Sequence, residues 1–452
     1  MRNGLFLLFV LLVALGPTAA SAAPPDVRGP LHALTWTPPP RDCPNLTAMV
    51  WVREGSFPET AAAESRRAPA GRAGIFFFDM TRGVMNHPYD RCLTPDGKRT
   101  KWHGLWPDNG VKILRDRAEF FFRRFRAAGG RADFVVLDHE DAPSMWGLKR
   151  ENLDAIAADP RADALRRELG FDDLAKIYDF QRSPEYLQWN AVVTRIVTDA
   201  LNTGVFEPAR AAYPDVGGSN FESYVLAREH VVPEQNGHHS YTLNQFGTHA
   251  SPALYGTIGH LRNARLGGAD GPAYGDTPLA VLRWHVNRLR AIARSSDAPL
   301  RPWISHKTFA ESVFRDNDYY QELLYHLALH GADGLLLWNP VGGVDDPNHA
   351  TLRTPETDRV VDRCLTELNE RFGDGPRRCA TPDGMRWDSP VVATGMTIGQ
   401  GGGARVLWRV TVTPGTTSVR VNPAGNAIEL KGAVGAWYET KPDAPAPTFE
   451  PM

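Results

Sequence analysis

The sequence predicts an α/β fold with parallel strands, followed by a small all-β segment. Up to Cys379, short apolar runs that end in polar residues alternate with stretches whose apolar residues recur at the helical period. Strand, helix and strand in this order are typical of βαβ units, whose strands pair in parallel. After Cys379 the pattern changes to apolar–polar alternation with Gly- and Asn-rich turns, which is typical of antiparallel sheets. With 452 residues, the chain is long enough for one large and one small domain.

The N-terminus has the layout of a signal peptide. Met1 and Arg2 precede an apolar run over residues 4–16, and small residues follow to Ala23. We therefore expect residues 1–22 to be removed and the protein to be secreted or periplasmic. No later run approaches the ~20 apolar residues of a membrane span, so none is expected.

The expected large domain covers residues 31–380, and its first elements follow a proline-rich lead-in over residues 24–45. A helix is expected at 111–128, because Ile113, Phe121 and Phe125 recur near the helical period, and Gly129 stops it. The other elements expected in this half are strands at 46–52, 74–78, 134–138 and 209–213, a loop at 61–70, and a helix at 186–201.

The second half continues the alternation. Pro278 opens an expected helix over 278–293, while Gly331 and Gly373 end helices that begin near Tyr319 and Thr354. The segments expected to hold strands are 240–255, which Pro252 interrupts, 301–305 and 334–338. Beyond them, residues 386–441 predict a small β-sandwich-like domain, and the tail from Lys441 is expected to be loose.

Two acidic residues follow the apolar run 134–137. The run leads directly into Asp138, His139, Glu140 and Asp141. Because side chains alternate along a strand, Asp138 and Glu140 point to one face and their neighbours to the other. Two carboxylates side by side at a strand end are costly unless they are paired or used, and α/β barrels keep their catalytic groups at the carboxyl ends of strands. We therefore favour a catalytic pair over a structural ion pair.

Five stretches, taken in order along the chain, resemble hyaluronidase-type glycoside hydrolases. They are FVVLDHED, ending in D-x-E; SPALYG; VLRWHVNRLRAIA with PLRPWISHKTF; ALHGADGLLLWN; and CLTELNERFGDGPRRC. The resemblance spans residues 46–379. It implies a distorted (β/α) TIM-like barrel of seven to eight strands. It also implies endo-acting cleavage, with retention, of a glycosaminoglycan-like polysaccharide beside an N-acetylhexosamine.

The resemblance also implies roles for individual residues. Glu140 would be the general acid/base, and Asp138 would position the 2-acetamido group of the substrate, which itself attacks the anomeric carbon. Tyr255 and Arg288 would contact the substrate, and Trp338 would stack under a sugar. A D-x-E pair on one strand face suits this chemistry, because inverting catalysis needs carboxyls roughly 6.5–9.5 Å apart.

Further candidates lie around this set. A tyrosine of the family falls on Ala211 here, and Tyr213 or Tyr224 is expected to take its place at the substrate. Asp79 follows the apolar run GIFFF and lies at another expected strand end, where it could bind substrate. Trp106, in the run WHGLW, could line a glycan groove or serve packing.

The composition and the histidines exclude other classes of function. A formal net charge of −2 without a basic stripe speaks against nucleic-acid binding. The histidine spacings match no zinc motif, so neither a metal nor a cofactor is expected; they involve His238, His239, His249, His260, His326 and His330. A polysaccharide is the expected partner, and a monomer is favoured.

The four cysteines are disulfide candidates in an exported protein. They are Cys43, Cys92, Cys364 and Cys379, and three pairings are possible. A bond between Cys43 and Cys364 is favoured because it would join the two ends of the large domain. The alternative is that one or two of them remain buried thiols.

Two other functions stay open at this point. One is a two-carboxylate retaining glycosidase, with Glu140 as the acid and a second carboxylate such as Asp215 as the nucleophile. The other is a non-catalytic glycan-binding barrel protein. The small β domain is expected to be a packing lid or a carbohydrate module.

Overall fold

The computed structural model describes most of the chain outside its N-terminal segment. The described residues are 27, 29–53, 55–77, 87–138, 150–170, 174, 184–221, 246–254, 277–295, 298–305, 317–338, 355–380 and 389–452. Glu140, Asp79, Tyr224 and Tyr255 therefore lie outside the described residues, and so does the side chain of Arg288.

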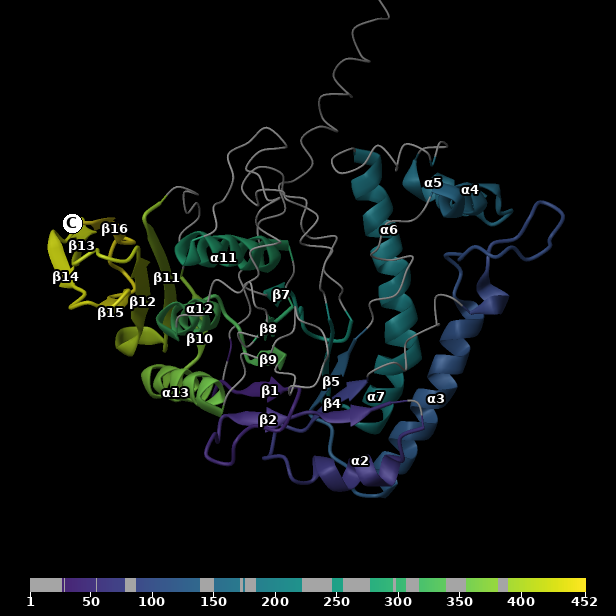
Figure 1. Cartoon of the computed structure of the whole chain (residues 1–452), viewed down its shortest axis with the longest axis horizontal. Coiled ribbons are helices and arrows are strands. Elements are labelled where there is room, and N and C mark those ends of the chain that lie inside the picture. The colour runs from purple at the N-terminus through teal and green to yellow at the C-terminus, as the bar shows by residue number, and fades with distance from the viewer. Residues whose placement is uncertain are drawn as a thin grey trace, which may run out of the picture.

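Two parallel sheets form the centre of the molecule (Figure 1). The five-stranded sheet has the order β2-β1-β9-β8-β7, with β1 Ala33–Thr35, β2 Leu46–Ala48, β7 Ala253–Leu254, β8 Trp303–Ser305 and β9 Leu335–Trp338. The four-stranded sheet has the order β3-β4-β5-β6, with β3 Val50–Val52, β4 Gly74–Phe77, β5 Phe134–Leu137 and β6 Gly217–Asn220. Every neighbouring pair within them is parallel, which confirms the predicted α/β class.

The strand order is TIM-like, because the last parallel strand, β9, pairs with the first, β1. Strands β2 and β3 form one stretch that only Met49 interrupts; β2 pairs with β1, and β3 pairs with β4. At the other side, the backbone N–H groups of Thr248 and His249, just before β7, donate to the carbonyl oxygen of Gly218 in β6, at 2.9 and 3.0 Å.

Alternation along each strand separates an inner from an outer face. In β5, Val135 and Leu137 belong to a cluster shared with the surrounding helices, whereas Phe134 and Val136 belong to a different cluster. That second cluster takes residues from both sheets, including Leu336 of β9. The two sheets therefore turn one face toward a common interior.

Helices cover the outer faces, as in an α/β fold (Figure 1). Those beside the four-stranded sheet are α2 Pro58–Ser65, α3 Asp108–Ala127, α6 Pro184–Leu201 and α7 Glu207–Ala212. Those beside the five-stranded sheet are α11 Pro278–Ser295, α12 Asn317–Leu329 and α13 Pro355–Phe372. The predicted apolar face of α3 is confirmed for Ala118, Phe121, Phe122 and Phe125, which are buried. It is wrong for Ile113, which is 38% exposed, because its neighbour Leu114 takes the buried position on that turn. Two further helices, α4 Arg150–Ala158 and α5 Ala162–Leu169, were not anticipated.

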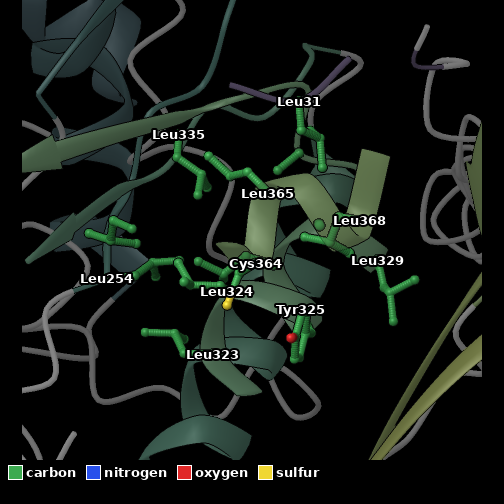
Figure 2. Close-up of a cluster of buried hydrophobic side chains, with 14 of the residues drawn as sticks. Leu31, Leu254, Leu323, Leu324, Tyr325, Leu329, Leu335, Cys364, Leu365 and Leu368 are labelled. Carbon is green, nitrogen blue, oxygen red and sulfur yellow. The ribbon is translucent and has the colours of Figure 1, made fainter. Parts of the chain in front are cut away.

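The C-terminal strands form antiparallel sheets, as predicted. The larger sheet has the order β10-β11-β12-β15, with β10 Arg377–Cys379, β11 Val391–Ile398, β12 Arg405–Val412 and β15 Gly435–Thr440. The smaller has the order β14-β13-β16, with β13 Ser418–Asn422, β14 Asn426–Glu429 and β16 Thr448–Pro451. Val392 and Leu407 of the larger sheet pack in the same core as α12 and α13, a part of which Figure 2 shows.

A buried polar network also joins α12 to the larger C-terminal sheet. The Glu322 carboxylate, whose side chain is 3% exposed, accepts two hydrogen bonds from the Arg409 guanidinium and one from the Thr411 hydroxyl. Arg409 also lies over the rings of Tyr325 and Trp437, 4.6 and 4.9 Å from their centres. The buried charges are therefore paired and hydrogen-bonded, which makes their burial tolerable.

Three secondary-structure predictions were wrong. The stretch 209–213 is not a strand: residues 209–212 end α7 and Tyr213 follows it, because the alanines sustain a helix that already runs through residues 202–206. The segment 61–70 was expected to be a loop, but its residues 61–65 form the end of α2. This helix begins at Pro58, and proline is favoured in the first turn of a helix. The tail is not loose throughout, because Phe449 of β16 pairs with Val421 of β13.

The expected disulfide between Cys43 and Cys364 is also wrong. All four cysteines are separate thiols. Cys43 and Cys364 both pack in the core of α11 to α13, and Figure 2 shows Cys364 among leucines there. The Cys92 thiol donates a hydrogen bond to the carbonyl oxygen of His103 at 3.0 Å. Each of these three thiols is thus used as a small, buried packing group.

Candidate functional site

Asp138 lies at the carboxyl end of β5 and continues its inner row. Its backbone N–H still donates to the carbonyl oxygen of Phe77 in β4, at 3.4 Å, so the residue stays in register with the sheet. Val136 and Phe134, two and four residues earlier, face the common interior. Strand alternation therefore places the half-buried Asp138 on the inner face.

Trp338 reaches the same interior from the other sheet. It is the last residue of β9, two positions after Leu336, and its ring packs against the inner cluster that also holds Phe134 and Val136. Two of the sequence-predicted site residues, Asp138 and Trp338, thus occupy the carboxyl ends of strands around one interior. This is the end of the strands at which α/β barrels bind their substrates.

Aromatic rings that sequence reasoning missed fill the interior beneath these two residues. We call the rings of Trp36, Trp51, Phe76, Phe221 and Trp303 the aromatic floor. Trp36 meets Trp51 edge to face at a centroid distance of 4.3 Å, and both lie against Phe76, at 4.7 and 5.3 Å. The indole N–H of Trp51 donates to the carbonyl oxygen of Trp36 at 2.7 Å. These contacts hold the rings in fixed orientations.

A signal for the floor was present in the sequence. Trp36 stands one residue after β1, and Trp51 two residues after Met49, so each continues an inner row in the way that Trp338 does. Both tryptophans are only half-buried. The guanidinium of the exposed Arg53 lies 4.9 Å from the ring centre of Trp51.

The arrangement suits a carbohydrate. Ring faces of tryptophan match the apolar faces of sugars, and a carboxylate accepts hydrogen bonds from hydroxyl or amide groups. Binding sites of this kind are mostly apolar, with a few polar groups that set the orientation of the ligand. The described part of the site contains both ingredients.

Tyr213, in contrast, does not lie near Asp138. Its hydroxyl donates to the carbonyl oxygen of Gly130 at 2.7 Å, and its ring packs against Phe122 and Phe125 of α3. Gly130 precedes β5, so Tyr213 lies at the amino end of the strands, on the outer side. Burial raises the pKa of Tyr213 to about 12. Ala211, in the last turn of α7, belongs to the same region.

Trp106 has a packing role in the structure. Its ring packs against the cluster around α3, and the Arg161 guanidinium lies 4.1 Å from the ring centre. Asp159, whose side chain is fully buried, accepts hydrogen bonds from Arg161 and from the backbone N–H of Leu93, which holds this arrangement in place.

A buried charged cluster occupies the opposite, amino end of the strands. Asp333 accepts hydrogen bonds from Arg301, at 3.1 Å, and lies 2.6 Å from the His249 ring. Burial would raise the pKa of Asp333, but Arg301 and His249 outweigh it and hold the pKa well below the usual range. All three residues precede strands, where polar clusters of α/β barrels serve stability.

Two negative findings concern only the described residues. Among them, no three His, Cys, Asp or Glu side chains gather closely enough to hold a metal ion. Within the same ranges, no helix is both long and apolar enough to cross a membrane.

Comparisons with known proteins give only remote likenesses. No protein-family model matches the chain, and no curated protein sequence matches it. Bee venom hyaluronidase in complex with a hyaluronic acid tetramer is 14% identical, with 64% of this chain and 82% of that chain covered and a TM-score of 0.33. The PgaB (BpsB) glycoside hydrolase domain from Bordetella bronchiseptica is 13% identical, with coverages of 65% and 80% and a TM-score of 0.36. The GH36 α-galactosidase AgaA from Geobacillus stearothermophilus is 8% identical, with coverages of 94% and 56% and a TM-score of 0.39.

Proposed function

We propose that this protein is an endo-acting glycoside hydrolase that cleaves a glycosaminoglycan-like polysaccharide beside an N-acetylhexosamine, with retention. The observation that carries the proposal is the carboxylate of Asp138 at the inner carboxyl end of β5, above the aromatic floor. The D-x-E run and the four other stretches that resemble hyaluronidase-type enzymes support it.

In this proposal Asp138 and Glu140 divide the chemistry. Asp138 accepts a hydrogen bond from the acetamido N–H and orients the carbonyl oxygen of that group, which attacks the anomeric carbon. The glycosidic C–O bond breaks as Glu140 gives its proton to the leaving oxygen. Glu140 then takes a proton from the water that opens the cyclic intermediate, so the configuration is retained. Trp338 stacks under the sugar, while Tyr255 and Arg288 contact the substrate.

The architecture belongs to the same proposal. We take residues 1–22 as a signal peptide of a secreted or periplasmic monomer, residues 31–380 as a closed, distorted barrel, and residues 386–441 as a small β domain. Two connections between the sheets support a closed ring of strands. One is the continuous stretch from β2 through Met49 to β3, and the other is the hydrogen bond from the His249 N–H to the Gly218 carbonyl oxygen.

The two-carboxylate alternative with Asp215 as the nucleophile has no support in the structure. Asp215 is exposed and lies two residues before β6, at the amino end of the strands, whereas Asp138 lies at the carboxyl end of β5. A nucleophile and an acid in a retaining enzyme must be about 5–5.5 Å apart.

The test is a panel of N-acetylated polysaccharides and their de-N-acetylated forms, assayed for new reducing ends. Activity should require the acetamido group. Glu140→Gln should lower the rate at least ~100-fold, as expected for the loss of a general acid, and Asp138→Asn should lower it as well. Asp215→Asn is the matched control and should leave the rate unchanged. Binding without any product across the panel would instead favour the non-catalytic barrel, and equal cleavage of de-N-acetylated polymer would rule out the acetamido mechanism.

A further inference from the structure

A groove runs along the β2–β3 strand. Residues 36–45 connect β1 to β2 without forming a helix, so this connection does not supply the helical cover that is usual between two parallel strands. A cavity of about 1130 Å³ lies there. Its lining includes most of the segment 36–44 and, just after α2, Arg67, Ala68 and Pro69.

The groove is continuous with the candidate site. Trp36 and Trp51 line the groove and also belong to the aromatic floor. Both tryptophans are half-buried, so part of each residue remains accessible. A chain molecule whose one unit lies over the floor near Asp138 and Trp338 can therefore place its next units along Trp36 and Trp51 and into the groove.

The lining favours a saccharide chain over an apolar partner. Exposed charged side chains, Arg41, Arg53, Arg67 and Glu64, stand along the groove beside the two tryptophans and several prolines. An apolar helix of another protein would bury these charges, which is costly. A sugar chain presents hydroxyl groups to the charges and apolar ring faces to the indoles. A saccharide chain can therefore bind both the charged side chains and the indole rings of the lining.

Trp51 is held ready for such a contact. Its N–H is bonded to the Trp36 carbonyl oxygen at 2.7 Å, and its ring lies edge to face with Trp36 and tilted against Phe76. A ring whose orientation is fixed before binding loses little conformational entropy on binding. Arg53, 4.9 Å from the ring centre, can donate hydrogen bonds to a sugar that stacks beside it.

We propose that the groove along the β2–β3 strand binds the sugars that adjoin the one held at Asp138, with Trp51 as their stacking platform. This inference rests on the proposed function, because it assigns the path of the same substrate. It adds a binding region that the acidic pair and Trp338 do not include.

The test measures binding by calorimetry in full-length protein that carries Glu140→Gln, so that no substrate turns over. Short and long oligosaccharides from a polymer that the unmodified enzyme cleaves are compared. Long chains should bind more tightly than short ones. Trp51→Ala should weaken long-chain binding up to about tenfold, the size expected for an aromatic contact.

Ala68→Trp places a large ring in the lining of the groove and should reduce long-chain affinity toward the short-chain value, while short-chain affinity stays the same. Phe120→Ala is the matched control, because Phe120 is an exposed ring on α3 with the Arg124 guanidinium 5.3 Å from its centre. It should change neither affinity.

Each outcome decides the question. If Ala68→Trp and Trp51→Ala leave long-chain binding unchanged, the groove is not the path of the substrate, although the proposed function still stands. If Ala68→Trp weakens the binding of short and long chains equally, the substitution acts on the sugar held at Asp138 and not on the adjoining sugars, and the inference fails as well. If no oligosaccharide is cleaved or bound by any form, the proposed function itself has failed.

Discussion

Replacing Arg409 by methionine should be among the most destabilising single changes in this protein. Methionine keeps the apolar stem of Arg409 but leaves the Glu322 carboxylate, 3% exposed, without a cation. Breaking a buried ion pair in this way costs about 3–5 kcal/mol. The guanidinium also leaves the rings of Tyr325 and Trp437, each of which contributes about 0.5–1 kcal/mol. The expected loss is therefore about 4–7 kcal/mol, a large share of the ~5–15 kcal/mol that stabilises a native protein.

The assay is urea unfolding at pH 7, followed by tryptophan fluorescence and by far-UV circular dichroism. Arg124→Met is the matched control. Arg124 pairs with Glu59 at 2.7 Å and also lies over an aromatic ring, but both side chains are nearly half exposed, 48% and 45%. Removing an exposed pair should cost less than about 1 kcal/mol. The double variant Glu322→Met, Arg409→Met should recover most of the loss, because apolar groups of similar volume replace the buried charges.

Two results would refute this reasoning. If Arg409→Met shifts the free energy of unfolding no more than Arg124→Met does, the carboxylate of Glu322 is not buried in solution. If the C-terminal strands unfold in a separate, earlier transition of the unmodified protein, they do not share a core with α12 and α13, contrary to the packing of Val392 and Leu407.

Three further predictions concern pH, a close backbone contact and the thiols. Burial lowers the pKa of His32 to about 4 and that of His326 well below its usual value, so the unfolded chain binds more protons below pH ~6.5. Stability should therefore fall by up to ~1.4 kcal/mol per pH unit for each histidine as pH drops from ~6.5 toward 4, and a urea midpoint constant from pH 7 to 5 would contradict this. Gly74→Ala places a Cβ 2.9 Å from Leu34 Cδ1 and should cost about 1–3 kcal/mol in the same assay. Gly402→Ala, which meets nothing within 4 Å, should be neutral, and equal effects would argue against the tight contact at Gly74. A thiol reagent at pH 8 should titrate four thiols after unfolding, but in the native protein it should react quickly with Cys379 alone. Burial raises the pKa of Cys43 to about 11 and those of Cys92 and Cys364 to about 12, so these three thiols stay protonated and slow to react. Fewer than four thiols in the unfolded protein would point to a disulfide.

Local signals in the sequence predicted the long elements well. The apolar run 134–137 and the helix at 108–127 were recognisable because burial of one face imposes its own period on the residues. Short elements were missed or mistaken. Strand β1 has three residues within a proline-rich segment, and its stability comes from pairing with β2 and with the distant β9. No window around Ala33 contains that information.

The candidate site divides in the same way. Alternation along β5 and β9 was enough to turn Asp138 and Trp338 toward one face. Whether two such faces meet depends on the order of strands in the sheets, which is a long-range property. Tyr213 is an example, because it was expected at the substrate but lies beside Gly130, at the amino end of the strands. The sequence around Tyr213 does not contain the strand order that decides this position.

By itself, the sequence determined where the long elements lie, which face of β5 and of β9 their residues occupy, and that Asp138 stands at the carboxyl end of β5, because these depend on side-chain period and chain direction alone. Only the tertiary structure decided which strands lie next to each other, and therefore which of their side chains come into contact. Strand order brought Trp36 and Trp51 together with Phe76 into a floor. Packing of α12 and α13 against the C-terminal sheet kept Cys364 as a thiol in a common core and paired Glu322 with Arg409. These contacts join residues far apart in the chain, and their free energy arises from burial that no single segment can achieve alone.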